Sequence, residues 1–539
     1  MKMRFLIKTA SLFLAVFLLA GMCITAASAA EIHDDTAVAA QKAPAEVTNN
    51  LPSYYSSLDL GYVTEIKSQQ YQDCWAYACL ATLETFLLKF GYNVGNMSIK
   101  HLNVWASART NGKGWLRGYW DSGYPSIALG YLTSWQGAVA EKDLKETDIV
   151  LGDYGDTAPT DLARYGVTEA KYLTQSGLEE IKQAIFDNGA VFTSYAQSSL
   201  CMSRDRLSYF MPSDYTGSYE GHSISVVGWD DNYSRDNFTG SIDAKPSRDG
   251  AWLIKNSWGN NNELGGYFWM SYEDKWVFSD KYTPSYTIQG VELLNPYSKL
   301  IQNEIYGATY EFDYISSDNL TFINRLQFDS DYEMIDKVVF ESTAVGAEYT
   351  LYFVPDGANK TPDTDTAHWT TLHSGTVDYK GYICADIEDF RIPEDGGSLA
   401  VQIDVSETGG KSTLGVGEWL TSNGKLVFIN ESQRGESYIM HDGVTEDLLD
   451  WYQRENNDEL GGTFVIKAIT AKENRPSLVG DADEDGIVSI YDVTKIQRHL
   501  AKYITLDGTS SLNADFNFDG EITIDDATAI QRMLAEIED

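Results

Sequence analysis

The chain has 539 residues, of which 43% are hydrophobic, so it is long enough to form about three separately folded domains. Acidic residues outnumber basic ones by 79 to 40, which gives a formal net charge of −39 at pH 7. Such a charge repels phosphate backbones and anionic lipid, which argues against binding to nucleic acid or to a membrane surface.

Residues 1–30 have the pattern of a secretory signal peptide. Three basic residues precede an apolar run at 11–22, and small residues follow at 25–30. Met22 stands where a small residue should precede a lipidated Cys23, so we expect cleavage and not a lipid anchor. No later apolar run is long enough to span a bilayer. The sequence therefore predicts a secreted, extracellular protein.

The next 20 residues, 31–50, are rich in Ala and polar residues and predict a flexible lead-in. Residues 51–287 then mix helical and strand patterns. The apolar run at 75–90 predicts a largely buried helix, and 221–231 and 250–258 predict strands. Helices that precede a sheet favour an α+β domain.

A second helix of this domain is predicted over 176–189. Ser176 is the expected N-cap, with Glu179 three residues later, and Gly189 is the expected end of the helix.

Cys74 stands directly before the helix predicted at 75–90. It is either a nucleophile or a small buried hydrophobe, since free cysteine is among the most buried residue types. A helix N-terminus lowers the pKa of a thiol, which favours the nucleophile, whereas Cys79 lies within the helix and is expected in the core. Four cysteines remain after the signal, too few for a disulfide framework.

Of the seven histidines, only His101 and His222 share the predicted domain with Cys74. Strand alternation puts His222 on an apolar face, so a core histidine remains an alternative to a catalytic base. The second strand ends in Asn256 and Trp258, and antiparallel pairing would bring Asn256 to His222. The amide would fix the imidazole tautomer while the Trp shields the pair from water.

Four segments resemble the papain-like cysteine peptidases. They are 66–70, the Cys-Trp-Ala-Tyr run at 74–77, the Gly-His strand at 221–229, and the Asn-Ser-Trp-Gly run within 254–259, which is followed by Gly-Tyr within 265–270. The resemblance covers about 51–285.

This resemblance implies a cysteine endopeptidase that needs no catalytic cofactor and acts on protein or peptide substrates. It implies Cys74 as nucleophile, His222 as general base and then acid, and Asn256 as the residue that orients His222. It also implies Gln69 as the side-chain donor of the oxyanion hole. The segment between Gln69 and Cys74 is one residue shorter than usual, so Gln70 is the alternative donor.

Three features depart from that family. Gln72 and Asp73 replace a Gly-Ser pair, and a carboxylate beside the thiol would disfavour the thiolate and narrow the approach to it. An insertion at 230–250 lengthens the stretch of sequence between Cys74 and Asn256. The lead-in is too short for the family's inhibitory propeptide, so any latency must arise otherwise.

Residues 288–470 alternate between apolar and polar in short runs separated by turn residues, which predicts an all-β sandwich. Bacterial papain-like domains followed by a lectin-like sandwich have this arrangement. Carbohydrate is therefore a candidate partner, although Trp369 and Trp419 could equally be core residues. The expected strands include 336–342, 348–355, 398–405 and 463–470.

A polar linker at 471–477 leads to a small α-helical region, 478–539, with a duplicated acidic loop at 481–492 and 515–526. Each copy places oxygen donors at the positions of a calcium loop, with Gly at the turn and apolar 3,4-spacing in the helix that follows. The expected calcium ligands are Asp481, Asp483, Asp485, Ile487 (backbone), Ser489 and Asp492, then Asp515, Asn517, Asp519, Glu521 (backbone), Thr523 and Asp526.

These loops differ from a common EF-hand because Asp stands at the last position and no entering helix precedes the first loop. The duplicated loop and exiting helix resemble a type I dockerin, which implies two bound Ca²⁺ and a cohesin partner on a scaffoldin, as in a cellulosome. The implied cohesin contacts are Ile490, Tyr491, Gln497 and Arg498, then Ile524, Asp525, Gln531 and Arg532.

Together these patterns predict a secreted cysteine endopeptidase docked into a cellulosome-type complex. The alternative is a non-catalytic subunit with a degenerate peptidase fold whose sandwich binds carbohydrate or cell wall.

Overall fold

The structure is a computed structural model that describes residues 51–92, 94–107, 114–115, 117–119, 121–145, 159, 161–308, 310–315, 320–357, 361–404, 411–417, 428–429, 432–441, 444–456, 462–518 and 520–535. The predicted signal peptide and lead-in, Trp419 and Asp519 lie outside these residues. No helix in the described part of the chain is long and apolar enough to cross a membrane.

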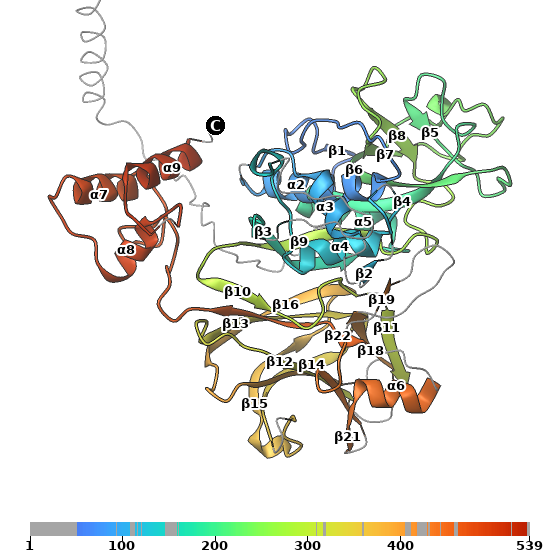
Figure 1. The fold of residues 1–539 in the computed structure, drawn as a ribbon. Helices are drawn as coiled ribbons and strands as arrows, with labels where there is room; N and C mark the ends of the chain where they lie inside the picture. The colour runs from blue at the N-terminus through green and yellow to red at the C-terminus, as the bar shows by residue number, and fades with distance from the viewer. Residues whose placement is uncertain are drawn as a thin grey trace, which may run out of the picture. The chain divides into compact units, whose positions relative to one another are not determined.

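The first region combines helices with a mainly antiparallel sheet, as the sequence predicts (Figure 1). Its helices are α2 (Cys74–Lys89), α3 (Ile99–Trp105), α4 (Pro125–Thr133) and α5 (Leu178–Asn188). Its strands are β1 (Tyr54–Ser56), β2 (Gly114–Trp115), β3 (Tyr165–Tyr172), β4 (Val191–Gln197), β5 (Ser208–Tyr209), β6 (Glu220–Asp230), β7 (Ala251–Lys255), β8 (Tyr267–Ser271) and β9 (Tyr286–Leu293).

Helix α2 is buried along most of its length because its residues are apolar on nearly every face. It lies against β6, the strand that carries His222. Cys79 is fully buried in the same core, as expected. The helix therefore brings its first residue, Cys74, to the part of β6 that follows His222.

Helix α5 begins one residue later than the predicted N-cap would place it. Its N-cap is Gly177 in an extended conformation, and not Ser176, whose side chain hydrogen-bonds the Glu180 carboxylate instead. The predicted end is confirmed, since Gly189 has φ 89° and donates its N–H to Ile185.

The second region is the predicted β-sandwich (Figure 1). One sheet carries β10, β23, β13 and β16, and the other has the order β15-β14-β17-β12-β20-β21. A helix, α6 (Leu448–Asn456), was not predicted. The strands are β10 (Ser298–Ile301), β11 (Tyr310–Ile315), β12 (Leu320–Leu326), β13 (Met334–Ser342), β14 (Glu348–Pro355), β15 (Thr370–Thr376), β16 (Gly381–Arg391), β17 (Gly397–Ile403), β18 (Lys411–Gly417), β19 (Phe428–Ile429), β20 (Ser437–His441), β21 (Val444–Asp447), β22 (Thr463–Phe464) and β23 (Ile466–Ala471).

The sandwich and the first region share one sheet. Strand β16 pairs with β3 through Gly381 and Tyr382, so the sheet continues from one region into the other. A side chain at Gly381 would overlap the carbonyl oxygen of Ala170 on β3, which explains why this crossing holds a glycine.

The two regions also share a hydrophobic core. A single buried cluster contains Trp75 of α2 and four residues of the sandwich. These are Val339 on β13, Tyr382 on β16, Ile469 on β23, and Val465 between β22 and β23. The shared core means that each region buries part of its apolar surface against the other.

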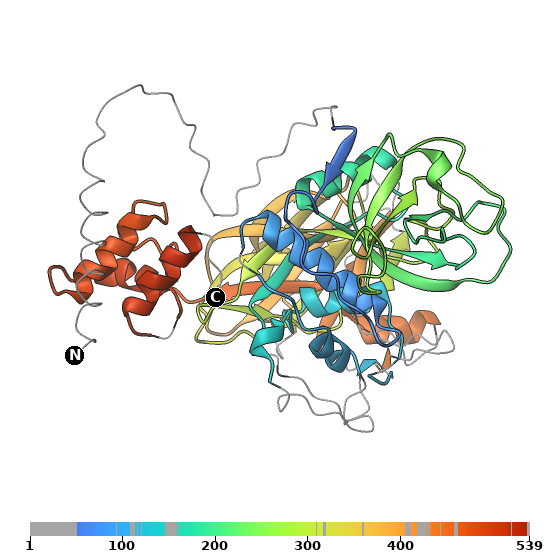
Figure 2. The ribbon, with the colours of Figure 1, turned by 90° about the horizontal axis from the view of Figure 1, so that it is seen from above.

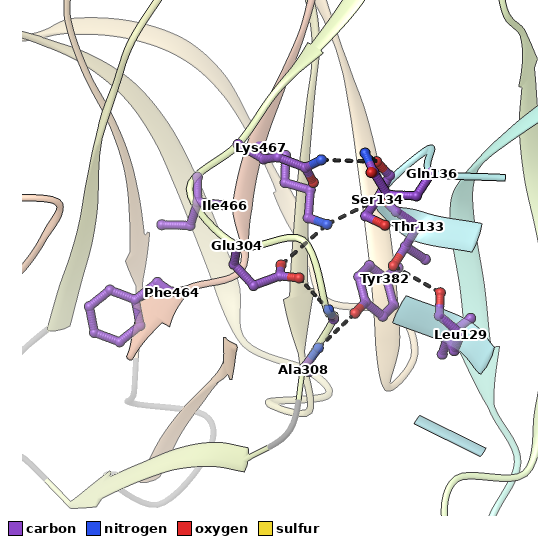
Figure 3. A network of polar contacts seen from close by, with 12 residues as sticks. Leu129, Thr133, Ser134, Gln136, Glu304, Ala308, Tyr382, Phe464, Ile466 and Lys467 are labelled. Carbon is purple, nitrogen blue, oxygen red and sulfur yellow. Dashed lines mark hydrogen bonds and ion pairs between the residues drawn. The ribbon is translucent and has the colours of Figure 1, made fainter. Parts of the chain in front are cut away.

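A buried ion pair lies in this interface (Figure 3). Lys467 Nζ is 3.2 Å from Glu304 Oε2, and both side chains are 1% exposed. Lys467 also donates to the carbonyl of Thr133 at the end of α4, at 3.2 Å. The pair therefore ties β23 of the sandwich to a helix of the first region.

The C-terminal region has three helices, α7 (Ile490–Leu500), α8 (Gly508–Ala514) and α9 (Ile524–Leu534) (Figure 2). Helices α7 and α9 follow the two acidic loops as predicted, and each begins with a capping box, on Ser489 and Thr523. Helix α8 was not predicted. Of the apolar residues at 3,4-spacing in these helices, the buried ones are Val493, Ile496, Ala527 and Ile530. Leu500 is half-buried, and Leu534, near the end of α9, is 40% exposed.

Candidate active site

Cys74 is the first residue of α2, and its side chain is half-buried. Its Sγ atom accepts a hydrogen bond from the backbone N–H of Ser223 at 3.5 Å. Because Ser223 directly follows His222, this contact places the start of β6 against the sulfur. The sulfur thus lies between a helix N-terminus and the strand of the candidate base.

His222 and Asn256 are brought together by the predicted antiparallel pairing of β6 with β7. His222 Nε2 lies 2.9 Å from Asn256 Oδ1, and the indole of Trp258 stacks on the imidazole with the ring centroids 4.7 Å apart. When Nε2 donates to the amide oxygen, Nδ1 is the ring atom left to accept a proton. His101 is elsewhere, fully buried and bonded to Tyr131.

Burial favours the neutral forms of both Cys74 and His222. It raises the pKa of the Cys74 thiol; the Ser223 hydrogen bonds lower this pKa and the Asp73 charge raises it further. Burial lowers the pKa of His222 to about 4, although the hydrogen bond with Asn256 opposes the shift. The two shifts therefore favour a neutral thiol beside a neutral imidazole over an ion pair.

Gln69 is fixed by Ser257, a residue that the sequence analysis missed. The Gln69 backbone N–H donates to the Ser257 carbonyl at 2.8 Å, and the Ser257 hydroxyl donates to Gln69 Oε1 at 2.5 Å. This leaves the amide Nε2 as the donor end, and it donates to the Tyr71 carbonyl at 2.9 Å. Gln70, by contrast, is exposed and donates to the nearby Ser68 carbonyl at 3.3 Å.

Asp73 differs from the expectation that it would narrow the approach to the thiol. It is 4% exposed, and its Oδ2 accepts a hydrogen bond from Asn103 Nδ2 on α3 at 3.2 Å. The carboxylate is therefore turned into the protein. Sequence patterns could not show this, because Asn103 lies 30 residues away.

Buried charged residues connect the segments that carry the candidate site residues. Lys255, which precedes Asn256, donates to the carbonyl and hydroxyl of Thr64 at 2.8 and 2.7 Å. Glu84 of α2 accepts from Lys67 at 3.1 Å. Burial lowers the pKa of Lys255 to about 8. These contacts tie the segment before Gln69 to α2 and to β7, and hence fix the distance between the candidate residues.

The first acidic loop of the C-terminal region brings three expected calcium ligands together. Carboxylate oxygens of Asp481, Asp483 and Asp485 lie within 4.8 Å of one another. Asp492 is fully buried and accepts from the N–H groups of Asp483 and Ser489 at 2.9 and 2.7 Å. Hard oxygen donors converging on one point suit Ca²⁺.

The second loop repeats the backbone geometry of the first. The glycines at the turn, Gly486 and Gly520, both have φ 86°, and the residues two positions earlier, Glu484 and Phe518, have φ 60° and 59°. Asp526 accepts from the N–H groups of Phe516, Asn517 and Thr523, as Asp492 does in its own loop. Asp515 is buried and accepts from Gly520, while Asn517 and Glu521 are exposed.

In both loops the residue expected at the ninth position also caps a helix. The hydroxyls of Ser489 and Thr523 accept from the N–H groups of Tyr491 and Asp525, each at 3.1 Å. Ile487 contributes its N–H to Asp485 at 2.9 Å. Of the expected cohesin-contacting residues, Ile490, Tyr491 and Ile524 are 52%, 70% and 55% exposed.

Family comparisons match three segments of the chain. The papain family cysteine protease description matches residues 51–286, the lectin-like domain 300–470 and the dockerin type I domain 479–535. A search of curated proteins finds no match.

Two solved structures of the protease Cwp84 are similar over both the first region and the sandwich. One, a Clostridial cysteine protease after propeptide cleavage, is 33% identical, covers 78% of this chain and 99% of its own, and has a TM-score of 0.68. The other contains the cysteine protease and lectin-like domains of this surface layer associated protein of Clostridium difficile. It is 31% identical with a TM-score of 0.68 and covers 79% of this chain and 90% of its own.

Proposed function

The chain belongs to the papain family of cysteine proteases and carries a lectin-like domain and a type I dockerin domain, and from this premise we propose that it is an exported endopeptidase with a Cys74–His222–Asn256 site. The hydrogen bond between His222 and Asn256, with Ser223 against the Cys74 sulfur, is the observation that supports the proposal best.

In the first half of the reaction, Cys74 Sγ attacks the carbonyl carbon of the peptide bond while its proton passes to His222 Nδ1. The carbonyl electron pair moves onto oxygen, where the backbone N–H of Cys74 and the Gln69 amide stabilise it. The C–N bond then breaks, and His222 gives its proton to the leaving amine. The product is a thioester on Cys74.

In the second half, water attacks the thioester and transfers a proton to His222. The C–S bond breaks as His222 returns the proton to sulfur, so the peptide acid leaves and the thiol is restored. Asn256 keeps Nε2 protonated throughout, and Trp258 covers the His222–Asn256 pair against competing water.

An epoxide inhibitor directed at thiols tests this site on the full chain in reducing buffer. We expect one label on Cys74, found by mass spectrometry, and loss of peptide cleavage in Cys74→Ala. Cys79→Ala is the matched control and should retain both, since Cys79 is buried in the core. Absence of label and of cleavage in the wild type would instead support a non-catalytic binding subunit.

For the dockerin region we propose that each loop binds one Ca²⁺ and that the loaded region docks to a cohesin. When bound, the ion would neutralise the converging carboxylates and hold the loop closed. Asp481, Asp483, Asp485 and Asp492 would hold it in the first loop, and the corresponding residues in the second. The exposed apolar side chains of Ile490 and Tyr491 favour a protein partner.

Chelation tests the calcium proposal. Removing Ca²⁺ should abolish cohesin binding, measured by calorimetry, while peptide cleavage persists. Asp481→Asn should weaken binding in the same assay, and the exposed Asp507→Asn is the matched control. Cohesin binding that survives chelation would contradict the proposal.

Export is part of the same proposal and rests on the sequence of residues 1–30. The mature N-terminus, determined by mass spectrometry of the protein from culture medium, should follow the small residues at 25–30. A full-length chain retained in cells would contradict export.

A further inference from the structure

The Asp73 carboxyl group is buried immediately before the candidate nucleophile. Asp73 is the N-cap residue of α2, but its side chain makes no capping hydrogen bond there. Its Oδ2 accepts from Asn103, and among the described residues its Oδ1 is a buried oxygen with no hydrogen-bond partner. A charged group in such a place needs a compensating charge nearby.

Arg117 supplies that charge from the far side of Asn103. Its guanidinium is 1% exposed and donates to Asn103 Oδ1 at 3.3 Å and to the Asn103 carbonyl at 3.1 Å. Asn103 therefore gives its amide N–H to Asp73 and takes one from Arg117, which fixes the orientation of the amide. The three side chains form a chain of hydrogen bonds from carboxylate to guanidinium.

Arg117 also reaches the residue on the other side of Cys74. Its guanidinium carbon lies 5.1 Å from the ring centroid of Trp75, and it donates to the carbonyls of Ser122 at 3.2 Å and of Asp121. Arg117 thus links Asp121 and Ser122 to the Trp75 ring, and it is linked to Asp73 through Asn103. A side chain at Gly123 would approach the Trp75 ring to 2.5 Å, so the chain at Gly123 touches the indole directly.

In the described part of the chain, the other titratable groups near Asp73 and Cys74 are Tyr77, Tyr195 and His222. Tyr77 of α2 is close to Asp73, but burial, followed by the Asp73 charge, raises its pKa to about 12, so it is neutral. Burial favours the neutral form of His222 on β6 and of Tyr195 on β4, and the charge of the exposed Glu141 raises the pKa of Tyr77. Of these groups, Asp73 is the one whose charge raises the pKa of the Cys74 thiol, and Arg117 is the cation that lowers the pKa of Asp73.

We propose that the Asp73 carboxylate, held ionised by Arg117 through Asn103, restrains the reactivity of the Cys74 thiol, with Arg117 as the positioning residue. A negative charge at the helix N-terminus opposes the thiolate, which the helix dipole would otherwise favour. Burial raises the pKa of the Asp73 carboxyl, whereas backbone groups of Asp73 and Tyr71, the Asn103 amide and, as the smallest contribution, the Arg117 charge lower it. Mild acid that protonates Asp73 would release the restraint.

The proposal deepens the proposed function, because it takes Cys74 as the reacting thiol. Its test is the pH dependence of Cys74 alkylation by iodoacetamide, with the modified cysteine located by mass spectrometry. This titration needs no peptide substrate, so it remains informative if the protein cleaves no peptide. Failure of the proposed function would appear separately, as cleavage that persists in Cys74→Ala.

Asp73→Asn should lower the apparent pKa of the thiol by about half a pH unit or more, which corresponds to roughly threefold faster alkylation below that pKa. The substitution keeps an oxygen that can accept from Asn103, replaces the second oxygen with an NH2 group and removes the charge. Glu141→Gln removes an exposed carboxylate that acts on Tyr77; it is the matched control and should leave the titration unchanged. An unchanged titration in Asp73→Asn would overturn the proposal.

Arg117 is tested by a double-mutant cycle. In Arg117→Met the carboxyl loses a charge that lowers its pKa, so adding Asp73→Asn should change the thiol pKa less than it does in the wild-type background. Arg117→Lys should restore the effect of Asp73→Asn, because it keeps the charge. If Asp73→Asn shifts the thiol pKa equally in the wild-type and Arg117→Met backgrounds, Arg117 has no such role. Thermal unfolding of each variant separates this result from a folding defect, and Arg117→Lys carries the test if Arg117→Met does not fold.

Discussion

The backbone N–H of Ser223 donates to the sulfur of Cys74 across 149 residues of sequence. This contact joins the first residue of α2 to β6 at the point where His222 begins the buried part of that strand. Since β6 also pairs with β7, the same strand sets the position of the sulfur, the imidazole and the Asn256 amide. The candidate site is therefore assembled on β6, with α2 packed against this strand and β7 paired to it.

The two candidate oxyanion donors differ in how firmly they are held. Gln69 is bonded to Ser257 by backbone and side chain, whereas Gln70 is exposed. We expect Gln69→Ala to lower kcat roughly 100-fold with little change in KM, because the donor acts mainly in the transition state. Steady-state kinetics with a peptide substrate measure this. Gln70→Ala is the control, and a larger loss there would reverse the assignment.

Stability should fall in acid because of His222. Its pKa is about 4 in the folded protein, below the ordinary value near 6.5, so the unfolded chain takes up the proton first as pH falls. Its contribution to the free energy of unfolding is full above pH 6.5 and decreases by about 3 kcal/mol down to pH 4. Urea unfolding at pH 7 and 4.5 should show a smaller loss for His222→Gln than for the wild type. Equal losses would contradict a buried neutral imidazole.

Breaking the buried pair of Lys467 and Glu304 should be costly. Lys467→Met leaves Glu304 buried without its cation, and we expect a loss of about 3–5 kcal/mol in the free energy of unfolding. The double substitution Lys467→Met with Glu304→Gln should recover most of that loss, since neither charge remains. Chemical denaturation of both variants measures the difference. Similar losses in the two would show that the charge imbalance is not the cause.

The peptidase region should not fold without the sandwich. Four sandwich residues, Val339, Tyr382, Val465 and Ile469, bury apolar surface in the core that contains Trp75. At about 1.5–3 kcal/mol for each buried side chain, their removal costs roughly 6–12 kcal/mol, as much as the whole stability of a typical domain. A chain ending at residue 287 should lack cooperative thermal unfolding and activity, whereas one ending at 477 should keep both. An active, cooperatively folded 51–287 fragment would contradict the shared core.

Local patterns were sufficient for the parts of the fold that depend on local sequence. The run after Cys74 is apolar on nearly every face, and alternation around His222 gave a strand whose pairing brings Asn256 into contact. The positions of turn glycines and apolar spacing likewise indicated the two acidic loops and the helices that follow them.

Features that depend on distant partners could not be predicted in this way. The burial of Asp73 requires Asn103 and Arg117, and the fixing of Gln69 requires Ser257, which is 188 residues away. The start of α5 at Leu178 shifted because the Ser176 hydroxyl contacts Glu180. No short stretch of sequence indicates that β3 pairs with β16, because the two strands belong to different regions and lie about 200 residues apart in the chain.

A sheet and a core shared by two regions also make them thermodynamically linked. Any ligand that binds the folded sandwich more tightly than the unfolded chain raises the free energy of unfolding of the catalytic centre by the same amount. Residual peptidase activity after heating would thus report on what the sandwich binds. An enzyme of this construction would withstand heat longest where that ligand is abundant.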